Sequence, residues 1–259
     1  MSPTSISPPR AVIFDAYGTL FDVHSVVAAA EQLFPGHGDA LSQLWRQKQI
    51  EYTQLRTLSD PAGARYEPFW AITLDALRYA ATRLKLDHAL TPAAEKRLMD
   101  EYACLAAFPD TVAALKTLRK RPDLKLAILS NGNPQMLDIA VKSAGMSGLF
   151  DHVLSVDAVR AYKPAHAAYA LGTQAIGVAA SEIVFVSSNG WDVTGATWFG
   201  YTTFWLNRMA LPAEQLGVLP RGTGRDMTDL LAFIDAGCPR HQQAAPFDLA
   251  KRMPRSPTK

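Results

Sequence analysis

Asp15 is the residue whose position points most directly to chemistry. It closes a short apolar run that begins at Val12, and Gly18 and Thr19 follow within four positions. A run so short and apolar predicts a strand in a sheet that is covered on both faces, and Gly18 permits a sharp turn away from it. A carboxylate at the tip of a buried strand costs stability unless it has a cation or a task. Asp15 is therefore predicted to lie at the mouth of an open α/β sheet, where such proteins keep their sites.

Two further polar clusters follow predicted strands. The sequence SNG at 130–132 comes directly after KLAIL, and SSNGWD at 187–192 comes directly after IVFV. Between them, Lys163 stands in the sequence AYKP at the start of a predicted helix. The C-terminal ends of parallel strands share one edge, so these residues should converge on Asp15. Each cluster alone also fits turn formers and helix caps, but the whole set favours a site in which Lys163 is the counter-ion of Asp15.

The elements that must position these residues follow from the hydropathy pattern. After the first strand, almost ninety residues show apolar positions three and four apart, which is typical of helices. From Phe108 onward helix and strand alternate, which predicts a parallel sheet with right-handed crossovers. We therefore predict an α/β core from residues 10–21 and 108–235, interrupted by an all-helical cap at 22–107. The expected helices span 24–34, 39–55, 66–84, 91–108, 110–121, 133–145, 166–177 and 191–200, and the expected strands 12–14, 125–131, 152–157, 182–188 and 201–207.

Composition indicates a soluble globular protein in a reducing compartment. The 259 residues are 48% hydrophobic and 19% charged, and no stretch is long and apolar enough to span a bilayer. The formal charge is +2, but residues 240–259 hold five Lys or Arg and one Asp, so the rest of the chain sums to −2. That balance argues against a nucleic-acid partner, and we expect segments 1–9 and 240–259 to be disordered. With two cysteines and no signal peptide, we expect a cytoplasmic protein without a disulfide framework.

The motifs together resemble a known family. The order Asp-x-x-x-Thr, Ser-Asn, Lys-Pro and Ser-Ser-Asn-x-x-Asp is similar to that of the haloacid dehalogenase superfamily. The segments FDAYGTLFDV, LWRQKQ, LAILSNG, YKP and FVSSNGWDVTGA resemble the L-2-haloacid dehalogenases within it. The resemblance covers about residues 10–235. It implies a Rossmann-like parallel sheet with helices on both faces and an inserted cap, and an enzyme that converts short (S)-2-haloacids to 2-hydroxy acids with inversion.

The resemblance also implies roles for individual residues. The catalytic set would be Asp15 as the nucleophile that forms an ester, Lys163 as its cation, Thr19 as its hydrogen-bond donor, and Ser187, Asn189 and Asp192 around the water that hydrolyses the ester. Arg46 and Asn131 would bind halide, and Ser130 the substrate carboxylate. The largely apolar pocket wall would consist of Tyr17, Gln47, Ile50, Phe69 and Trp191, with Tyr169 near Lys163. Taken alone, Phe69, Trp191 and Tyr169 also fit ordinary packing, and Arg46 fits an exposed helix position.

Tyr17 distinguishes the dehalogenases from the phosphatases of the superfamily. The phosphatases carry a second aspartate at this position, which protonates the leaving alcohol, and they bind magnesium beside the nucleophile. Tyrosine is a poor acid at neutral pH, whereas halide leaves without a proton. The resemblance therefore implies no metal and no cofactor, although Asp192 could also serve as a magnesium ligand.

Three alternatives stay open beside a dehalogenase: a magnesium-dependent phosphatase, a related hydrolase with a non-halogen leaving group, and a non-catalytic binding module. The expected partners are a small 2-haloacid and halide. We expect neither nucleic acid nor membrane as a partner. Apolar cap faces and the resemblance suggest a homodimer.

Overall fold

The structure, a computed structural model, describes residues 8–239. A six-stranded sheet forms the centre of this part of the chain. Its strands are β1 (Ala11–Phe14), β2 (Lys125–Ser130), β3 (His152–Ser155), β4 (Ile183–Ser187), β5 (Thr202–Leu206) and β6 (Gly222–Gly224). They are arranged in the order β3-β2-β1-β4-β5-β6, and every pair is parallel. β1 therefore lies inside the sheet, and the carboxyl ends of all these strands meet at one edge.

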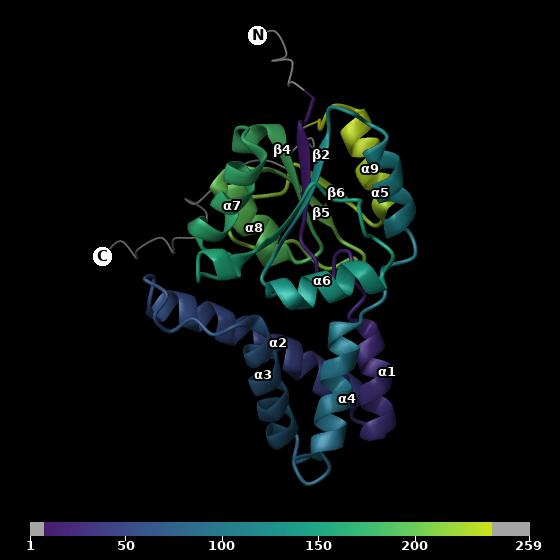
Figure 1. The fold of residues 1–259 in the computed structure, drawn as a ribbon, viewed down its shortest axis with the longest axis vertical. Helices are drawn as coiled ribbons and strands as arrows, with labels where there is room; N and C mark the ends of the chain where they lie inside the picture. Colours follow the sequence, from purple (N-terminus) through teal and green to yellow (C-terminus); the bar gives the residue numbers. More distant parts are fainter. Residues whose placement is uncertain (1–7, 240–259) are drawn as a thin grey trace, which may run out of the picture.

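Helices cover both faces of this sheet. They are α5 (Thr111–Arg119), α6 (Pro134–Ser143), α7 (His166–Ile176), α8 (Gly190–Phe199) and α9 (Met227–Asp235), with short 3₁₀ turns at Val156–Ala158 and Ala180–Glu182. Val12 and Phe14 belong to a buried cluster with residues of α5, α6 and α9, whereas Ala11 and Ile13 belong to a second cluster with residues of α7 and α8. This burial on both faces is why β1 is apolar throughout. In Figure 1, α7 and α8 lie to the left of the sheet and α5 and α9 to the right.

Four helices between β1 and α5 form the cap. They are α1 (His24–Leu33), α2 (Gly38–Ser59), α3 (Phe69–Arg83) and α4 (Pro92–Ala103). Figure 1 shows them as a separate layer below the sheet. The buried positions of α2 recur every three to four residues, as expected for a helix with one face turned inward. These positions are Gly38, Leu41, Trp45, Gln49 and Thr53.

The cap is joined to the core where the chain leaves and re-enters it. Phe21 and Ala107 form a bridge between these two segments, and the N–H of Phe108 donates to the carbonyl oxygen of Leu20 at 3.1 Å. The two crossings therefore lie side by side. They fit domain boundaries near residues 21 and 108, and those boundaries stay a prediction.

The connection between α2 and α3 makes a second attachment to the core. The Tyr162 hydroxyl donates to the carbonyl oxygen of Glu67, and the rings of Tyr66 and Tyr162 stack with their centroids 4.8 Å apart. The backbone N–H of Tyr162 donates to Thr57 Oγ1 at 3.0 Å. Because Tyr162 directly precedes Lys163, the cap is tied to the core segment that carries the predicted counter-ion.

The α/β fold with a helical cap is confirmed. Each predicted helix and strand up to β5 is present, and Thr91 caps the start of α4 as expected, because its hydroxyl accepts from the N–H of Ala94. β6 and α9 were not predicted from the sequence. The predicted terminal disorder falls on residues 1–7 and 240–259, which lie outside the described residues, and on Pro8 and Pro9, which have no regular secondary structure.

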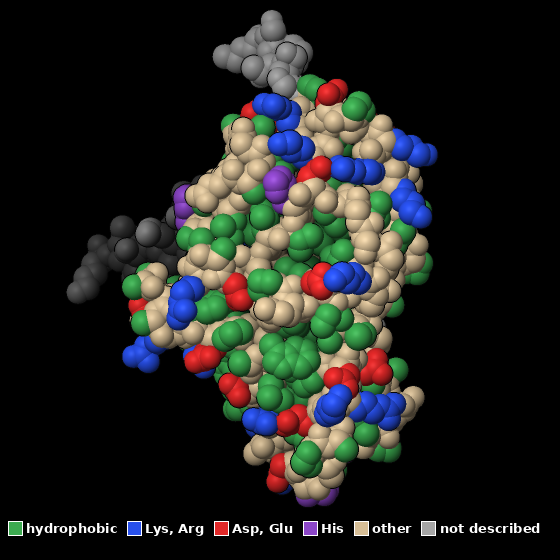
Figure 2. Space-filling model, in the orientation of Figure 1, with side chains coloured by type: hydrophobic (Ala, Val, Ile, Leu, Met, Phe, Trp, Pro, Cys, Tyr) green, Lys and Arg blue, Asp and Glu red, His purple; other side chains and the backbone are tan. Residues whose placement is uncertain are grey.

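Two further features concern the helices and the surface. Among residues 8–239, no helix is long and apolar enough to cross a membrane. Figure 2 shows Lys and Arg side chains interspersed with Asp and Glu side chains over the face in view.

Candidate active site

Asp15 lies at the carboxyl end of β1, between β2 and β4. Its N–H donates to the carbonyl oxygen of Val186 at 2.9 Å, which extends the pairing of β1 with β4 by one residue. Gly18 has a φ of +87°, a left-handed conformation that turns the chain sharply. After this turn the Thr19 hydroxyl donates to Asp15 Oδ2 at 2.9 Å. Asp15 is only 5% exposed, so its charge depends on such partners.

Lys163 supplies the positive charge that a buried carboxylate requires. Its Nζ lies 2.8 Å from Asp15 Oδ1 and 2.7 Å from Asp192 Oδ2, and it donates to the carbonyl oxygen of Leu129 at 3.3 Å. These contacts engage all three donors of the ammonium. Burial lowers the pKa of Lys163, but the attraction of the two carboxylates outweighs burial and raises the pKa above its ordinary value. Lys163 is therefore charged at neutral pH.

Asp192, in the first turn of α8, is fully buried. Its Oδ1 accepts from the Tyr169 hydroxyl at 2.8 Å, while Oδ2 faces Lys163. Burial raises the pKa of Asp192, the attraction of Lys163 opposes this rise, and the repulsion of Asp15 adds to it. The family resemblance implies that Tyr169 belongs to the substrate site near Lys163, but the residue does not line the cavity described below. It packs on Phe185 at the sheet face, from where its hydroxyl holds Asp192.

Asn189 completes the set of donors to the Asp15 carboxylate. Its Nδ2 donates to Asp15 Oδ2 at 3.0 Å, and its own N–H donates to Ser187 Oγ at 3.1 Å. Ser187 is fully buried and does not line the cavity, so its contact with the site runs through Asn189. Both oxygens of Asp15 are thereby held in a fixed orientation.

These groups open into a small cavity between the core and the cap. Its volume is about 300 Å³ when the open space at its mouth is included. The core contributes most of the polar groups, and the cap contributes one guanidinium and largely apolar side chains. The lining residues are Asp15, Tyr17, Arg46, Ile50, Thr53, Phe69, Ser130, Asn131, Lys163, Asn189 and Trp191. All of these except Thr53 are site residues in the sequence analysis.

The face that α2 presents to the cavity corrects one expectation. Gln47, predicted for the pocket wall, is exposed and does not line the cavity. Arg46, Ile50 and Thr53 follow the helical period of 3.6 residues and share one side, whereas Gln47 is turned by about 100° from Arg46. The period from Arg46 was the signal that could have identified Thr53.

Arg46 bridges the cap and the core at this cavity. From α2 its Nη2 donates to the carbonyl oxygen of Tyr17 at 3.3 Å and to Asn189 Oδ1 at 3.4 Å. Its Nη1 donates to Gln49 Oε1 at 2.6 Å, and it lies 3.3 Å from the Tyr102 hydroxyl. Neither Gln49 nor Tyr102 was predicted as a site residue. Gln49 could have been, because it is a polar residue about one helical turn from Arg46, whereas Tyr102 comes from α4 and no local pattern links it to Arg46.

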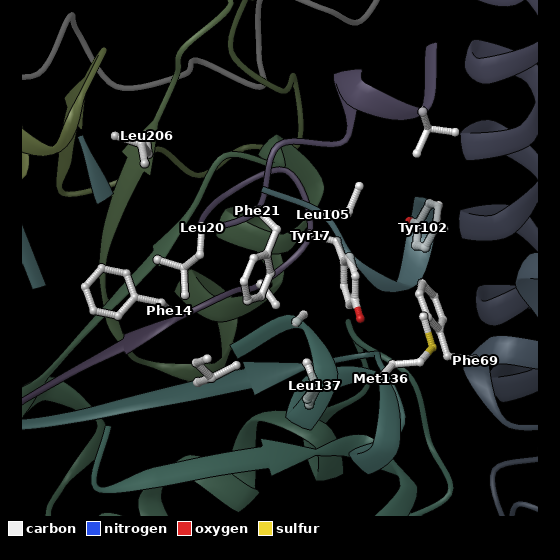
Figure 3. Packing of buried hydrophobic residues seen from close by; sticks show 14 of the residues in the cluster. Phe14, Tyr17, Leu20, Phe21, Phe69, Tyr102, Leu105, Met136, Leu137 and Leu206 are labelled. Carbon is white, nitrogen blue, oxygen red and sulfur yellow. The ribbon is translucent and has the colours of Figure 1, made fainter. Parts of the chain in front are cut away.

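Aromatic rings form the apolar part of the cavity. Tyr17 from the core faces two cap residues, with ring centroids 5.8 Å from Phe69 and 5.5 Å from Tyr102. Figure 3 shows these three side chains meeting between the two layers. Burial raises the pKa of Tyr17 far above its ordinary value, and the nearby Asp15 carboxylate adds to this rise. Its hydroxyl therefore stays protonated and is a very weak acid.

Ser130 and Asn131 supply polar groups from the end of β2. Ser130 Oγ accepts from the N–H of Gly132 at 3.0 Å, and Asn131 Oδ1 accepts from the N–H of Lys163 at 3.0 Å. The second contact fixes the orientation of the Asn131 amide. Its Nδ2 has no hydrogen-bond partner within residues 8–239, so this donor is free for a ligand in the cavity it lines.

The fold and the site define a class of hydrolase. A family model described as haloacid dehalogenase-like hydrolase matches residues 9–200, and the chain belongs to that family. The chain is 49% identical over 226 residues to the (S)-2-haloacid dehalogenase of Pseudomonas sp. (strain YL), covering 87% of this chain and 93% of that protein.

Solved structures of haloacid dehalogenases are also similar. The L-2-haloacid dehalogenase RSc1362 has a TM-score of 0.86 and 64% identity, covering 88% of this chain and 100% of that one. The enzyme from Xanthobacter autotrophicus with chloropropionic acid covalently bound has a TM-score of 0.77 and 37% identity, covering 88% and 98%.

Proposed function

We propose that this protein is an (S)-2-haloacid dehalogenase that hydrolyses short 2-haloacids to 2-hydroxy acids with inversion. The observation that carries the proposal is the Asp15 carboxylate held 2.8 Å from the buried Lys163 ammonium, in a cavity that the cap lines on one side. The names of the similar proteins support the same reaction.

In the first step, Asp15 attacks C2 of the substrate from the side opposite the halogen. The new bond joins a carboxylate oxygen to C2, and the carbon–halogen bond breaks with its electron pair leaving as halide. Lys163 pairs with the nucleophile at 2.8 Å, and Thr19 and Asn189 orient it. Covalent catalysis replaces one displacement by weakly nucleophilic water with two easier steps. The bound chloropropionic acid in the Xanthobacter enzyme supports an ester of this kind.

Halide and substrate are held by different parts of the cavity. Arg46 and the Asn131 amide donate to the departing halide, and Ser130 with nearby backbone N–H groups of the following turn binds the substrate carboxylate. The apolar wall of Tyr17, Ile50, Phe69 and Trp191 holds the alkyl chain. Because halide leaves without a proton, the weak acidity of Tyr17 is no handicap.

In the second step, water attacks the carbonyl carbon of the Asp15 ester. The bond between this carbon and the substrate oxygen breaks, which releases the hydroxy acid and leaves one water oxygen in Asp15. Asn189, which lines the cavity and has Ser187 behind it, orients that water. Asp192 lies behind Lys163 and does not line the cavity, and we assign it the role of base or orienting acceptor for the same water. The raised pKa of Asp192 favours acceptance of a proton.

The test is chloride release from (S)-2-chloropropionate by purified protein in EDTA. We expect equal amounts of chloride and (R)-lactate. No release from a folded sample would remove the proposal. Magnesium-dependent release of phosphate from p-nitrophenyl phosphate would instead indicate a phosphatase. Turnover of a halogen-free substrate would indicate a related hydrolase. Binding without turnover would indicate a binding module.

We also propose a cytoplasmic homodimer. Both Cys104 and Cys238 are free, which suits a reducing compartment. The cap exposes the large apolar side chains Leu55, Leu58 and Tyr79, and Figure 2 shows apolar side chains gathered over α2. Light scattering on the sample used for chloride release should give about twice 28.2 kDa, and a mass near 28.2 kDa would exclude the dimer.

A further inference from the structure

The interior of the cap holds a chain of polar contacts that ends at Arg46 and has no part in the mechanism above. The Thr73 hydroxyl on α3 donates to the carbonyl oxygen of Phe69 at 2.7 Å. Gln49 Nε2 donates to Thr73 Oγ1 at 2.7 Å, and Gln49 Oε1 accepts from Arg46 Nη1 at 2.6 Å. Thr73 and Gln49 are fully buried, and neither lines the cavity.

The donors and acceptors in this series of hydrogen bonds allow only one orientation of the Gln49 amide. A threonine hydroxyl carries a single proton, and here that proton goes to the Phe69 carbonyl. Thr73 Oγ1 can therefore only accept from Gln49, which requires the NH₂ side of the Gln49 amide to face Thr73. The carbonyl side of the amide must then face Arg46, as observed.

The orientation of the Gln49 amide determines the shortest hydrogen bond of Arg46, from its Nη1 to Gln49 Oε1. Without the Thr73 hydroxyl, the NH₂ group of Gln49 loses its acceptor, and the amide is held only through its carbonyl oxygen, by Arg46 and by the Tyr102 hydroxyl, which donates to Gln49 Oε1 at 3.1 Å. Gln49 then offers Arg46 a less firmly fixed acceptor. The other contacts of Arg46 are weaker, at 3.3 Å to the Tyr102 hydroxyl, 3.3 Å to the Tyr17 carbonyl oxygen and 3.4 Å to Asn189. They hold the guanidinium less firmly at the cavity.

We propose that Gln49 and Thr73 are positioning residues that orient the Arg46 guanidinium toward the departing halide. This role rests on the dehalogenase function proposed above. Both side chains act through Arg46. Because charge develops on the halogen only as the carbon–halogen bond breaks, their effect falls on kcat more than on KM.

Thr73→Val tests the proposal, because valine has nearly the shape of threonine but cannot accept from Gln49. We expect kcat for (S)-2-chloropropionate to fall about tenfold, the scale of one lost hydrogen bond to a charged group, with little change in KM. Binding of added bromide, measured by calorimetry, should weaken by a similar factor. Thr73→Ser keeps the hydroxyl and should restore both values.

Two further variants separate positioning from packing. Thr117→Val removes a threonine bond of the same kind, 3.0 Å to the carbonyl oxygen of Ala113 on the exposed side of α5, and should match the wild type. Gln49→Met should reproduce the losses of Thr73→Val, and the double variant should lose no more than Gln49→Met alone because both act through one bond.

The outcomes distinguish this proposal from the proposed function. Wild-type kcat and bromide binding in Thr73→Val, or equal losses in Thr73→Ser, would overturn the positioning role. If the wild type releases no chloride, the dehalogenase function fails instead. Bromide binding still tests the orientation of Arg46 in that case, because it requires no turnover.

Discussion

Asp15→Asn is expected to lower chloride release by about 10⁴-fold or more while the protein stays folded. Asparagine keeps the shape of aspartate but lacks the anionic oxygen that attacks C2, and losses of this scale follow removal of a central catalytic group. The variant should fold because Lys163 keeps a charged partner, its Nζ lying 2.7 Å from Asp192. Chloride release and thermal unfolding measure the two effects separately.

Asp138→Asn is the matched control for this change. Asp138 pairs with Lys142 at 2.8 Å on the exposed side of α6, and exposed pairs of this kind contribute little to stability. We expect wild-type turnover from the control. Turnover close to that of the wild type in folded Asp15→Asn would mean that another group attacks the substrate.

Lys163→Met is expected to remove activity and to destabilise the fold. Methionine has a similar length but no charge, so Asp15 and Asp192 would face each other in a buried site without their cation. Removing one partner from a buried ionic cluster costs about 3–5 kcal/mol. Activity should fall together with stability, because the nucleophile loses the ammonium that holds it in place beside Asp192.

The stability lost in Lys163→Met should depend on pH in a direction that the charges determine. Burial already raises the pKa of Asp192 in the wild type, and removal of the ammonium raises it further. A carboxyl group whose pKa is higher in the folded state costs no stability below its unfolded pKa, about 3.9 for aspartate. The variant should therefore lose stability, relative to the wild type, as pH rises through the raised pKa. Urea unfolding at pH 4 and pH 8 measures this difference, and an equal deficit at both values would contradict the ionic account.

The fold was predictable where the signals are local. β1 appears in the sequence as a continuous apolar run because both of its faces are buried, and Thr91 marks the start of α4. β6 has no such signal, since Gly222–Gly224 becomes a strand only by pairing with β5. Gly222 is also required by packing, because a Cβ there would lie 2.7 Å from the Phe233 ring. The start of α9 did have a local signal. Asp226 is a helix N-cap whose side chain accepts from the N–H groups of the first turn.

Some residues of the site were likewise predictable from the sequence, and others were not. Residues at strand ends were predictable because the parallel topology brings them to one edge, even across the 148 positions between Asp15 and Lys163. The cap residues were harder, because motif resemblance does not reveal which side of α2 faces the cavity. Gln47 was therefore included, whereas Thr53 and Gln49 were missed.

The most direct test of the central claim is a single turnover in ¹⁸O-labelled water with enzyme in excess over (S)-2-chloropropionate. Water enters at the Asp15 carbonyl carbon in this account, so mass spectrometry should find the label in the peptide that contains Asp15 and unlabelled oxygen at C2 of the lactate. Label at C2 of the lactate, with none in that peptide, would mean that water attacks the substrate directly and that no aspartyl ester forms.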